Sequence, residues 1–307
     1  MSGIISLTKS LAPLEGYNLT ALPDVRILRA DRPLSKTPVL YDPGIVIVCQ
    51  GSKRGYFGRQ TYVYDELHYL AVSVPVPFEM ETRASADHPL LAIYMHLNFQ
   101  LAAELILQIE QQGGYPAAAA PQSMMSSPMD ATVNTAVLRL LEVLNHPSEA
   151  AILGPGRVRE LYFRVLTGAQ GNAMRAALTL AGQFGKIGKV LQHIHASYAG
   201  ALTLTQLAQD AGMSVPTFHS HFKAITQMPP MQYVKSVRLH QARMLMVRQQ
   251  ITAAAASYAV GYESPSQFNR EFKRLFGLPP AEEIKRMMKQ HFAVPPEQPA
   301  TIFVSSH

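Results

Sequence analysis

Hydrophobic and polar positions follow two different periods along the chain. Over residues 36–97, short segments rich in Val, Ile, Tyr and Phe, such as GIVIVCQ and LLAIYMHL, are separated by Gly, Pro, Asp and Ser. In TYVYDELHYLAVSV, polar and apolar residues partly alternate, as in a half-buried sheet. This pattern predicts several short strands in a small barrel or sandwich.

From Phe99 onward, apolar positions recur at helical spacing, beginning with FQLAAELILQIEQQ. Residues 113–129 interrupt the pattern; they are low in charge and rich in Ala, Pro and Ser, which predicts a loop. Asp130 is a suitable N-cap for the next helix. Pro155 is a suitable first-turn residue for a helix that continues over 157–167.

Two helix pairs, each with a tight turn, are predicted over 204–223 and 252–276. In each pair a glycine stands where a helix-to-helix turn requires positive φ, and a serine soon after it is a suitable N-cap for the second helix. These residues are Gly212 with Ser214, and Gly261 with Ser264. Such a pair predicts a helix-turn-helix, whose second helix enters the major groove of DNA.

Phenylalanines four residues apart mark the buried side of both second helices: Phe218 with Phe222, and Phe268 with Phe272. Thr203 or Thr205 is a candidate N-cap for the first helix of the first pair. Between the pairs, PPMQYVKSVRLHQARMLMVRQ predicts one long helix.

The positive charge of the chain lies in the same region. The net charge is +6; residues 201–290 carry 11 Lys/Arg and 5 Asp/Glu, whereas residues 1–200 carry 16 and 15. Such an excess suits a polyanionic partner, although a solvated basic face would give the same count. Two helix pairs within the basic segment favour DNA as that partner.

The string GYESPSQFNREFKRLFGLPP, preceded by RLHQARMLM, resembles the signature of the AraC/XylS family of bacterial transcription regulators. The resemblance implies a seven-helix DNA-binding domain over 183–290, with two helix-turn-helix units on a rigid linker helix. Each monomer would place two recognition helices in successive major grooves of double-stranded promoter DNA, about one turn (~34 Å) apart.

Matched to the family motif, the base-edge candidates are Pro216, His219 and Ser220 in the first unit and Ser266, Gln267 and Arg270 in the second. The phosphate candidates are Lys223, Arg238, Arg243, Lys273 and Arg274. Two positions depart from the family pattern. Ser220 stands where a longer polar or basic side chain is common, and Gln227 stands where Gly is usual.

The N-terminal half also resembles the family. LYDPGIVIVCQGSKRGYFG, YDELHYLAVSVPVP and LYFRVLTGAQG are similar to the N-terminal domain of one AraC-type subfamily. The resemblance covers about 36–290 and implies an α+β chain. A cupin-like β-barrel followed by helices, over 1–180, would serve effector response and dimerisation, ahead of an all-α domain with two helix-turn-helix motifs. The tail, 291–307, contains no motif that we can interpret.

The helices predicted over 130–145 and 157–167 carry apolar stripes. These stripes either form a homodimer interface, which would raise the affinity for paired half-sites, or pack against the chain's own barrel. We favour the interface and expect a homodimer.

Cys49, the only cysteine, excludes an internal disulfide and fits a reducing compartment. It is either a buried structural thiol, which we favour, or an effector- or redox-sensing thiol helped by Lys53 and Arg54. Residues 50–58, QGSKRGYFG, either line an effector pocket or form a β-turn with a solvated basic pair, which we favour.

We expect a cytoplasmic protein with no membrane partner, because neither a signal peptide nor an apolar run of about 18 residues is present. We predict no metal, cofactor or catalytic residue. The β region contains His68, His88 and His96, no two of which are one residue apart in a strand, so they do not form a chelating pair.

The sequence points to three alternative classes of function. The first is a sequence-specific regulator with an unknown small-molecule effector and RNA polymerase as a candidate second partner. The second is a cupin-type enzyme with an accessory nucleic-acid-binding domain, against which the missing metal cluster argues. The third is an architectural DNA protein, against which Gln267 and Arg270 argue, since both can bond base edges.

Overall fold

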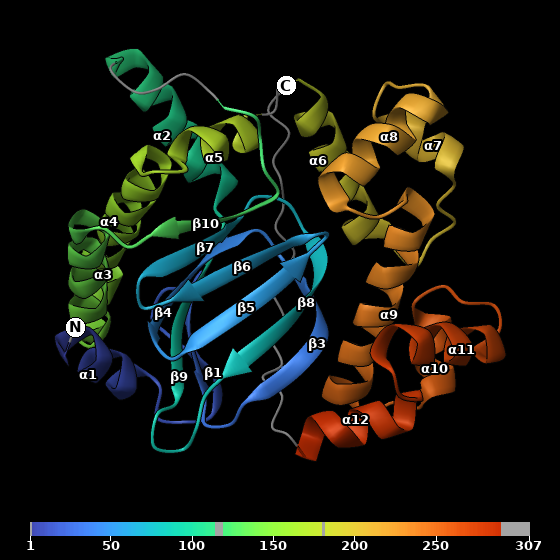
Figure 1. Ribbon diagram of the computed structural model, residues 1–307, viewed down its shortest axis with the longest axis horizontal. Coiled ribbons are helices and arrows are strands. Elements are labelled where there is room, and N and C mark those ends of the chain that lie inside the picture. Colours follow the sequence, from blue (N-terminus) through green and yellow to red (C-terminus); the bar gives the residue numbers. More distant parts are fainter. Residues whose placement is uncertain (1, 114–118, 180–181, 290–307) are drawn as a thin grey trace.

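The computed structural model describes residues 2–113, 119–179 and 182–289 (Figure 1). Within these residues, ten strands form one antiparallel sheet in the order β1-β2-β9-β4-β7-β6-β5-β8-β3, and β10 also pairs with β7. The strands are β1 (Gly16–Leu19), β2 (Val25–Ala30), β3 (Leu34–Tyr41), β4 (Gly44–Gln50), β5 (Ser52–Phe57), β6 (Gln60–Asp65), β7 (His68–Val72), β8 (Val76–Arg83), β9 (Leu90–His96) and β10 (Met124–Pro128).

The sheet curls so that its inner face encloses an apolar cluster. Alternate residues of β2 to β9 meet there, among them Val46, Phe57 and Phe78. Within the described residues no ladder joins the edge strands β1 and β3, so the curled sheet is an open half-barrel. Every residue of β4 is buried, because helices cover its outer side while the cluster covers its inner side.

Helices of the N-terminal half cover the outer face of the sheet, on the left of Figure 1. They are α1 (Ser2–Leu11), α2 (Phe99–Gln112), α3 (Ala131–Leu144), α4 (Pro147–Thr167) and α5 (Gly171–Leu178). Asp130 caps α3 as predicted, since its carboxylate accepts hydrogen bonds from the backbone N–H groups of Thr132 and Val133.

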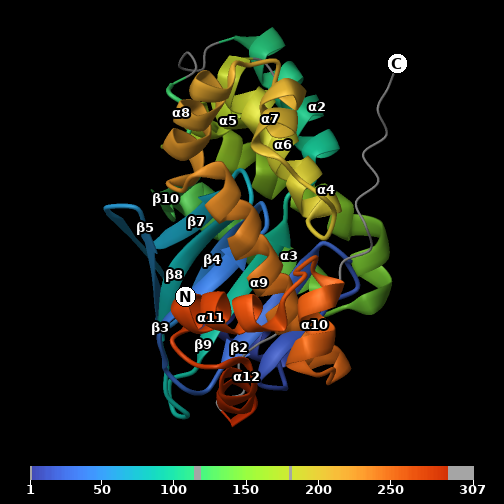
Figure 2. The same ribbon diagram turned by 90° about the vertical axis from the view of Figure 1, so that its right-hand side faces the viewer.

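The remaining helices form the C-terminal region, on the right of Figure 1. They are α6 (Gly182–Ser197), α7 (Leu204–Asp210), α8 (Val215–Thr226), α9 (Pro230–Gln249), α10 (Ala253–Ala259), α11 (Pro265–Phe276) and α12 (Pro280–Lys289). The pairs α7–α8 and α10–α11 lie at opposite ends of α9, which joins them (Figure 2). The predicted α+β fold, a β-barrel with helices followed by a helical region, is confirmed, with the sheet curled into a half-barrel rather than closed.

Two predictions about helix and loop boundaries were wrong. The second helix of the 130–167 region begins at Pro147, not at Pro155, because Pro147 already supplies the first-turn proline and Ala150 packs inside. Part of the predicted loop 113–129 is β10, which pairs with β7; residues 114–118 of that loop lie outside the described residues. The tail 291–307 also lies outside them.

Residues 50–58 are mostly a strand rather than a turn with a solvated basic pair. Side chains of β5 alternate, so Lys53 points inward and is 3% exposed, whereas Arg54 points outward and pairs with Glu81 at 3.5 Å. The sequence contains both basic residues but does not reveal their opposite environments.

Candidate nucleic-acid interface

The first helix pair is built by two caps and one glycine turn. Thr203 accepts from the backbone N–H of Gln206, and Ser214 accepts from that of Thr217. Between them Gly212 has φ +60°, and the N–H of Met213 bonds the carbonyl of Ala208 at 3.0 Å. This six-to-one bond closes α7 and redirects the chain into α8.

The second pair repeats these contacts with a different sequence. Thr252 and Ser264 cap α10 and α11, Gly261 has φ +83°, and the N–H of Tyr262 bonds the carbonyl of Ser257 at 2.9 Å. The predicted caps Ser214 and Ser264 are therefore both present, and Thr203 rather than Thr205 caps the first helix. Two units of the same local geometry are attached to one helix.

Both second helices pack on their phenylalanines and expose the opposite side. Phe218, Phe222, Phe268 and Phe272 are all fully buried. The six base-edge candidates are exposed: Pro216, His219, Ser220, Ser266, Gln267 and Arg270. The phosphate candidates Lys223, Lys273 and Arg274 are exposed as well. Asn269, also exposed on α11, was missed by the sequence analysis, although its side-chain amide can bond a base edge.

Gln267 is held in place by an acidic residue one turn further along α11. Its amide donates to Glu271 at 3.2 Å, and Glu271 also accepts from Lys235 at 2.8 Å and Tyr262 at 2.7 Å. Burial alone would raise the pKa of Glu271, but these donors outweigh it and hold that pKa below its usual value. The carboxylate thus links α11 to α9 and orients a base-edge candidate.

Two phosphate candidates have other partners. Arg243 is buried: it donates to the carbonyl of Pro38 at 2.9 Å, pairs with Glu283 at 3.5 Å and lies over the ring of Phe276 at 4.2 Å. The prediction that it contacts phosphate is wrong for this structure, because the side chain fills the junction between α9 and the edge strand β3.

Arg238 is the second corrected candidate. Its three guanidinium nitrogens donate to the carbonyls of Tyr198, Gly200 and Gly261, at 2.7, 2.8 and 3.1 Å. It therefore ties the linker helix to the end of α6 and to the turn of the second unit. In this arrangement its donors are directed at backbone carbonyls, not at a partner.

Gln227 occupies a position where the backbone favours glycine. Its φ is +58°, and the matching residue after α11 is Gly277 with φ +84°. The Gln227 side chain lies against Gly58 in the turn between β5 and β6. The first unit therefore contacts the sheet at the residue that departs from the family pattern.

Cys49 faces the outer cluster and is buried. Burial raises the pKa of its thiol to about 12, against a smaller lowering by a hydrogen bond with Thr8. Neither Lys53 nor Arg54 contributes to the shift, so the cationic help proposed for a sensing thiol is absent among the described residues. The favoured interpretation, a structural thiol, fits these surroundings.

The apolar stripe of α3 is buried inside the chain. Val133, Val137, Leu140, Leu141 and Leu144 are all within the outer cluster, against α1 and α4. Leu161 and Val165 of α4 are in the same cluster. The hypothesis that these stripes form a dimer interface is therefore wrong; they pack within their own chain.

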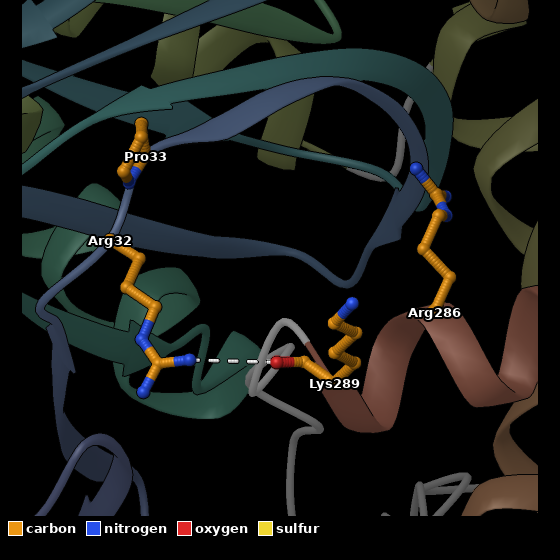
Figure 3. A pocket seen from close by; sticks show the side chains of 4 residues that line it. All are labelled: Arg32, Pro33, Arg286 and Lys289. Atoms are coloured by element: carbon orange, nitrogen blue, oxygen red, sulfur yellow. Dashed lines mark hydrogen bonds between the residues drawn. The ribbon is translucent and has the colours of Figure 1, made fainter.

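A pocket of about 400 Å³ lies where the two halves of the chain meet (Figure 3). Arg32 and Pro33 line it from the turn before β3, and Arg286 and Lys289 line it from α12. Arg32 donates to the carbonyl of Lys289 at 3.5 Å. Arg32 lies 3.8 Å from Glu15 and Arg286 lies 2.8 Å from Glu283, so the cationic character of the pocket is partly neutralised.

Among residues 2–113, 119–179 and 182–289, no three of His, Cys, Asp and Glu lie together as a metal site would require. No helix in that part of the chain has the length and apolar character to span a bilayer.

Comparison with known families matches both halves of the chain. The family described as AraC-type transcriptional regulator N-terminus matches residues 21–173, and a helix-turn-helix domain family matches residues 207–286. Relatives include the RCS-specific HTH-type transcriptional activator RclR of Escherichia coli, 29% identical over 102 residues, which are 33% of this chain and 36% of RclR.

The virulence regulon transcriptional activator VirF of Yersinia enterocolitica is 20% identical over 164 residues, 53% of this chain and 60% of VirF. Across the first relatives, the aligned part covers from 6% to 60% of the relative's own length. Among solved structures, ToxT of Vibrio cholerae bound to an unsaturated fatty acid has a TM-score of 0.61. It is 11% identical, over 88% of this chain and 97% of ToxT, and the likeness shows the fold alone.

Proposed function

Because this chain belongs to the AraC/XylS family and has the AraC-type N-terminal domain, we propose that it is a sequence-specific, ligand-responsive transcription regulator. It binds promoter DNA through two recognition helices, α8 and α11. The observation that carries this proposal is the repeated geometry of α7–α8 and α10–α11, each with a buried phenylalanine side and an exposed polar side.

The side chains have different roles in this proposal. Gln267 and Arg270 bond base edges, because an amide and a guanidinium each offer paired hydrogen-bonding groups that distinguish base pairs in the major groove. Lys223, Lys273 and Arg274 neutralise phosphates, which adds affinity without sequence information. Pro216, His219 and Ser220 face the DNA from the first unit.

The proposal is tested by selecting genomic DNA fragments with the full-length protein at near-physiological salt. We expect a site with two short sequence blocks about one helical turn apart, because both units read the major groove. Near-physiological salt is essential, since phosphate contacts alone retain DNA when salt is low. Enrichment without a shared sequence would contradict paired base recognition.

Two substitutions on α11 separate base recognition from phosphate binding. Arg270→Ala should relax discrimination at one base pair by about 1–3 kcal/mol. Lys273→Ala should weaken binding equally for all sequences and reduce the slope of log K against log salt by about 1. Lys36→Ala, an exposed lysine on β3, is the control and should change neither quantity. If Arg270→Ala kept full discrimination, Arg270 would not contact a base.

A homodimer, RNA polymerase and a cytoplasmic location also belong to the proposal, and we expect no catalytic activity of its own. The stripe of α3 cannot supply the dimer surface, because it is buried. Ile152 and Leu153 near the start of α4 are exposed large apolar side chains on the same domain, 79% and 46% exposed, and suit such a surface.

The effector site belongs in the N-terminal half. ToxT has been crystallised with an unsaturated fatty acid, and its fold is similar to that of this chain. The inner cluster of the curled sheet also extends to the first helix-turn-helix unit, since Leu207, Phe218 and Phe222 belong to it. A ligand within this cluster can therefore change how the first unit packs.

A further inference from the structure

Lys53 is a lysine buried inside the curled sheet. It lies on β5 with its side chain on the inner face and is 3% exposed. No hydrogen bond or ion pair connects it to any residue that the structure describes. Burial lowers the pKa of its amine to about 7. Taking an ammonium out of water is unfavourable unless another group compensates its charge.

Tyr64 lies directly across from Lys53 on the neighbouring strand. The two residues are register partners of β5 and β6, so their side chains share the inner face. Tyr64 is fully buried, and its hydroxyl has no hydrogen-bond partner among the described residues. Tyr41 lies close enough to affect the pKa of Tyr64, but the geometry is not that of a hydrogen bond.

Thr82 lies across from Lys53 on the other side, as its register partner in β8. It is 5% exposed, and its hydroxyl donates only to the sulfur of Met80, at 3.3 Å, a weak acceptor. Tyr64, Lys53 and Thr82 therefore form one polar row across three adjacent strands. Around the row the inner face is apolar, with Phe57, Phe78, Met80 and Leu90.

We propose that this row binds the carboxylate of a small acidic effector, whose apolar part packs against the inner face. Buried polar groups in proteins nearly always have a hydrogen-bond partner, and here an amine and a hydroxyl on opposing positions have none within the described chain. A carboxylate compensates the charge of Lys53 and has lone pairs for both hydroxyls. A neutral ligand would leave the ammonium charge uncompensated.

This inference deepens the proposed function by giving the chemical class of the effector. Binding of the acid is nevertheless independent of DNA recognition and can be measured without DNA. If the DNA selection failed while acid binding was found, the proposed role as a transcription regulator would be contradicted, whereas the proposed acid-binding site would remain supported.

The test uses full-length protein and two matched pairs of probes: benzoate with benzamide, and octanoate with octanamide. Thermal unfolding and isothermal titration calorimetry are recorded for wild type, Lys53→Met and Lys36→Met. Met keeps the length of the buried side chain without its charge. Lys36 lies on the same sheet but is exposed and paired with Glu79 at 2.7 Å.

We expect at least one carboxylate to raise the melting temperature of wild type and of Lys36→Met, while its amide does not. Lys53→Met should bind that carboxylate at least tenfold more weakly. Without ligand, Lys53→Met should melt at a higher temperature than wild type, because the substitution removes an uncompensated buried amine.

Three results would overturn the proposal. One is that neither carboxylate binds, in which case water alone satisfies the row. Another is that Lys53→Met binds as tightly as wild type, which would place the acid elsewhere, for example beside Arg32 and Arg286. The third is that unliganded Lys53→Met is less stable than wild type, as expected for a lysine with a structural partner.

Discussion

At the scale of single residues, the ionisation of Lys53 makes the stability of the protein depend on pH. The pKa of this amine is about 7 in the folded chain and about 10.4 in an unfolded chain. Between these values the unfolded chain binds more protons, so the free energy of unfolding rises with pH. Below pH 7 the buried amine becomes protonated in the folded chain as well, and the folded chain then contains an ammonium whose charge no other group among the described residues compensates.

We predict that the free energy of unfolding of wild type rises by about 2 kcal/mol more than that of Lys53→Met between pH 7 and 9. Guanidinium titrations of both proteins across this window measure the difference. Burial also raises the pKa of Cys49 and Tyr64, so their ionisation in the unfolded chain lowers stability at alkaline pH, but it does so equally in both proteins and cancels from the difference. Equal pH dependence in the two proteins would mean that Lys53 is hydrated.

The environments of some functional candidates could be predicted from the sequence, and those of others could not. The exposed positions on α8 and α11 could be predicted, because each helix has one apolar side marked by phenylalanines. The environments of Arg238 and Arg243 could not, because α9 is packed on several sides and buries polar residues such as Ser236 and His240. The spacing of apolar residues identifies the buried face of a helix only when the helix has one buried face and one exposed face.

At the scale of elements, short-range chemistry accounts for what could be predicted. The caps Asp130, Ser214 and Ser264 act within three residues of themselves, so the local sequence was sufficient. The strands β1, β2 and β10 were missed, because they are defined by pairing with distant strands rather than by their own composition. The open edge of the sheet likewise depends on long-range arrangement.

The two glycine turns provide a matched prediction at this scale. A Cβ at Gly261 would lie 2.3 Å from the carbonyl oxygen of Ala199, whereas a Cβ at Gly212 would meet nothing within 4 Å. Gly212→Ala should lower the free energy of unfolding by about 1 kcal/mol, for the positive φ alone. Gly261→Ala should lower it by more than 3 kcal/mol, since backbone must also move.

Chemical denaturation of both glycine variants measures these values, with Gly277→Ala as a second control. Gly277 has φ +84° and open space around it, so its substitution should resemble Gly212→Ala. If Gly212→Ala and Gly261→Ala lowered the free energy of unfolding equally, the backbone near Ala199 would shift easily to accommodate the new Cβ. The contact of Ala199 with the turn would then not fix the position of the second unit.

At the scale of the whole molecule, the apolar clusters divide the chain differently from the predicted boundary at 180–183. The first helix-turn-helix unit shares one cluster with the inner face of the sheet, whereas the second unit has a cluster of its own. Hydrogen bonds cross the same junction, from Ser123 to the carbonyl of Ile225 and from Tyr233 to that of Pro75. The first unit is therefore the one more closely tied to the N-terminal half of the chain.

Tyr233 permits a test of this division. Its hydroxyl donates to the carbonyl of Pro75 and contacts Nε2 of His195, both at 2.8 Å. Burial lowers the pKa of His195, which therefore stays neutral and can donate to the tyrosine oxygen. Tyr233→Phe leaves both partners buried without a bond, which should lower the free energy of unfolding by about 1–3 kcal/mol.

The segments that become less protected from exchange after Tyr233→Phe show whether this hydrogen bond links the two halves of the chain or stabilises only its own surroundings. In hydrogen exchange, Tyr233→Phe should raise deuterium uptake together in the β7–β8 turn, in α6 and at the start of α9, because the bond joins all three. Tyr262→Phe is the control: it loses a part-buried hydroxyl bond within the C-terminal region, to Glu271 at 2.7 Å, and should raise uptake only within α10 and α11. If Tyr233→Phe affected the helices and left the β7–β8 turn unchanged, the sheet and the first unit would move independently. An effector bound inside the sheet, as proposed, would then have to influence the DNA-binding helices through other contacts between the two halves, such as that of Arg243 with Pro38 or that of Ser123 with Ile225.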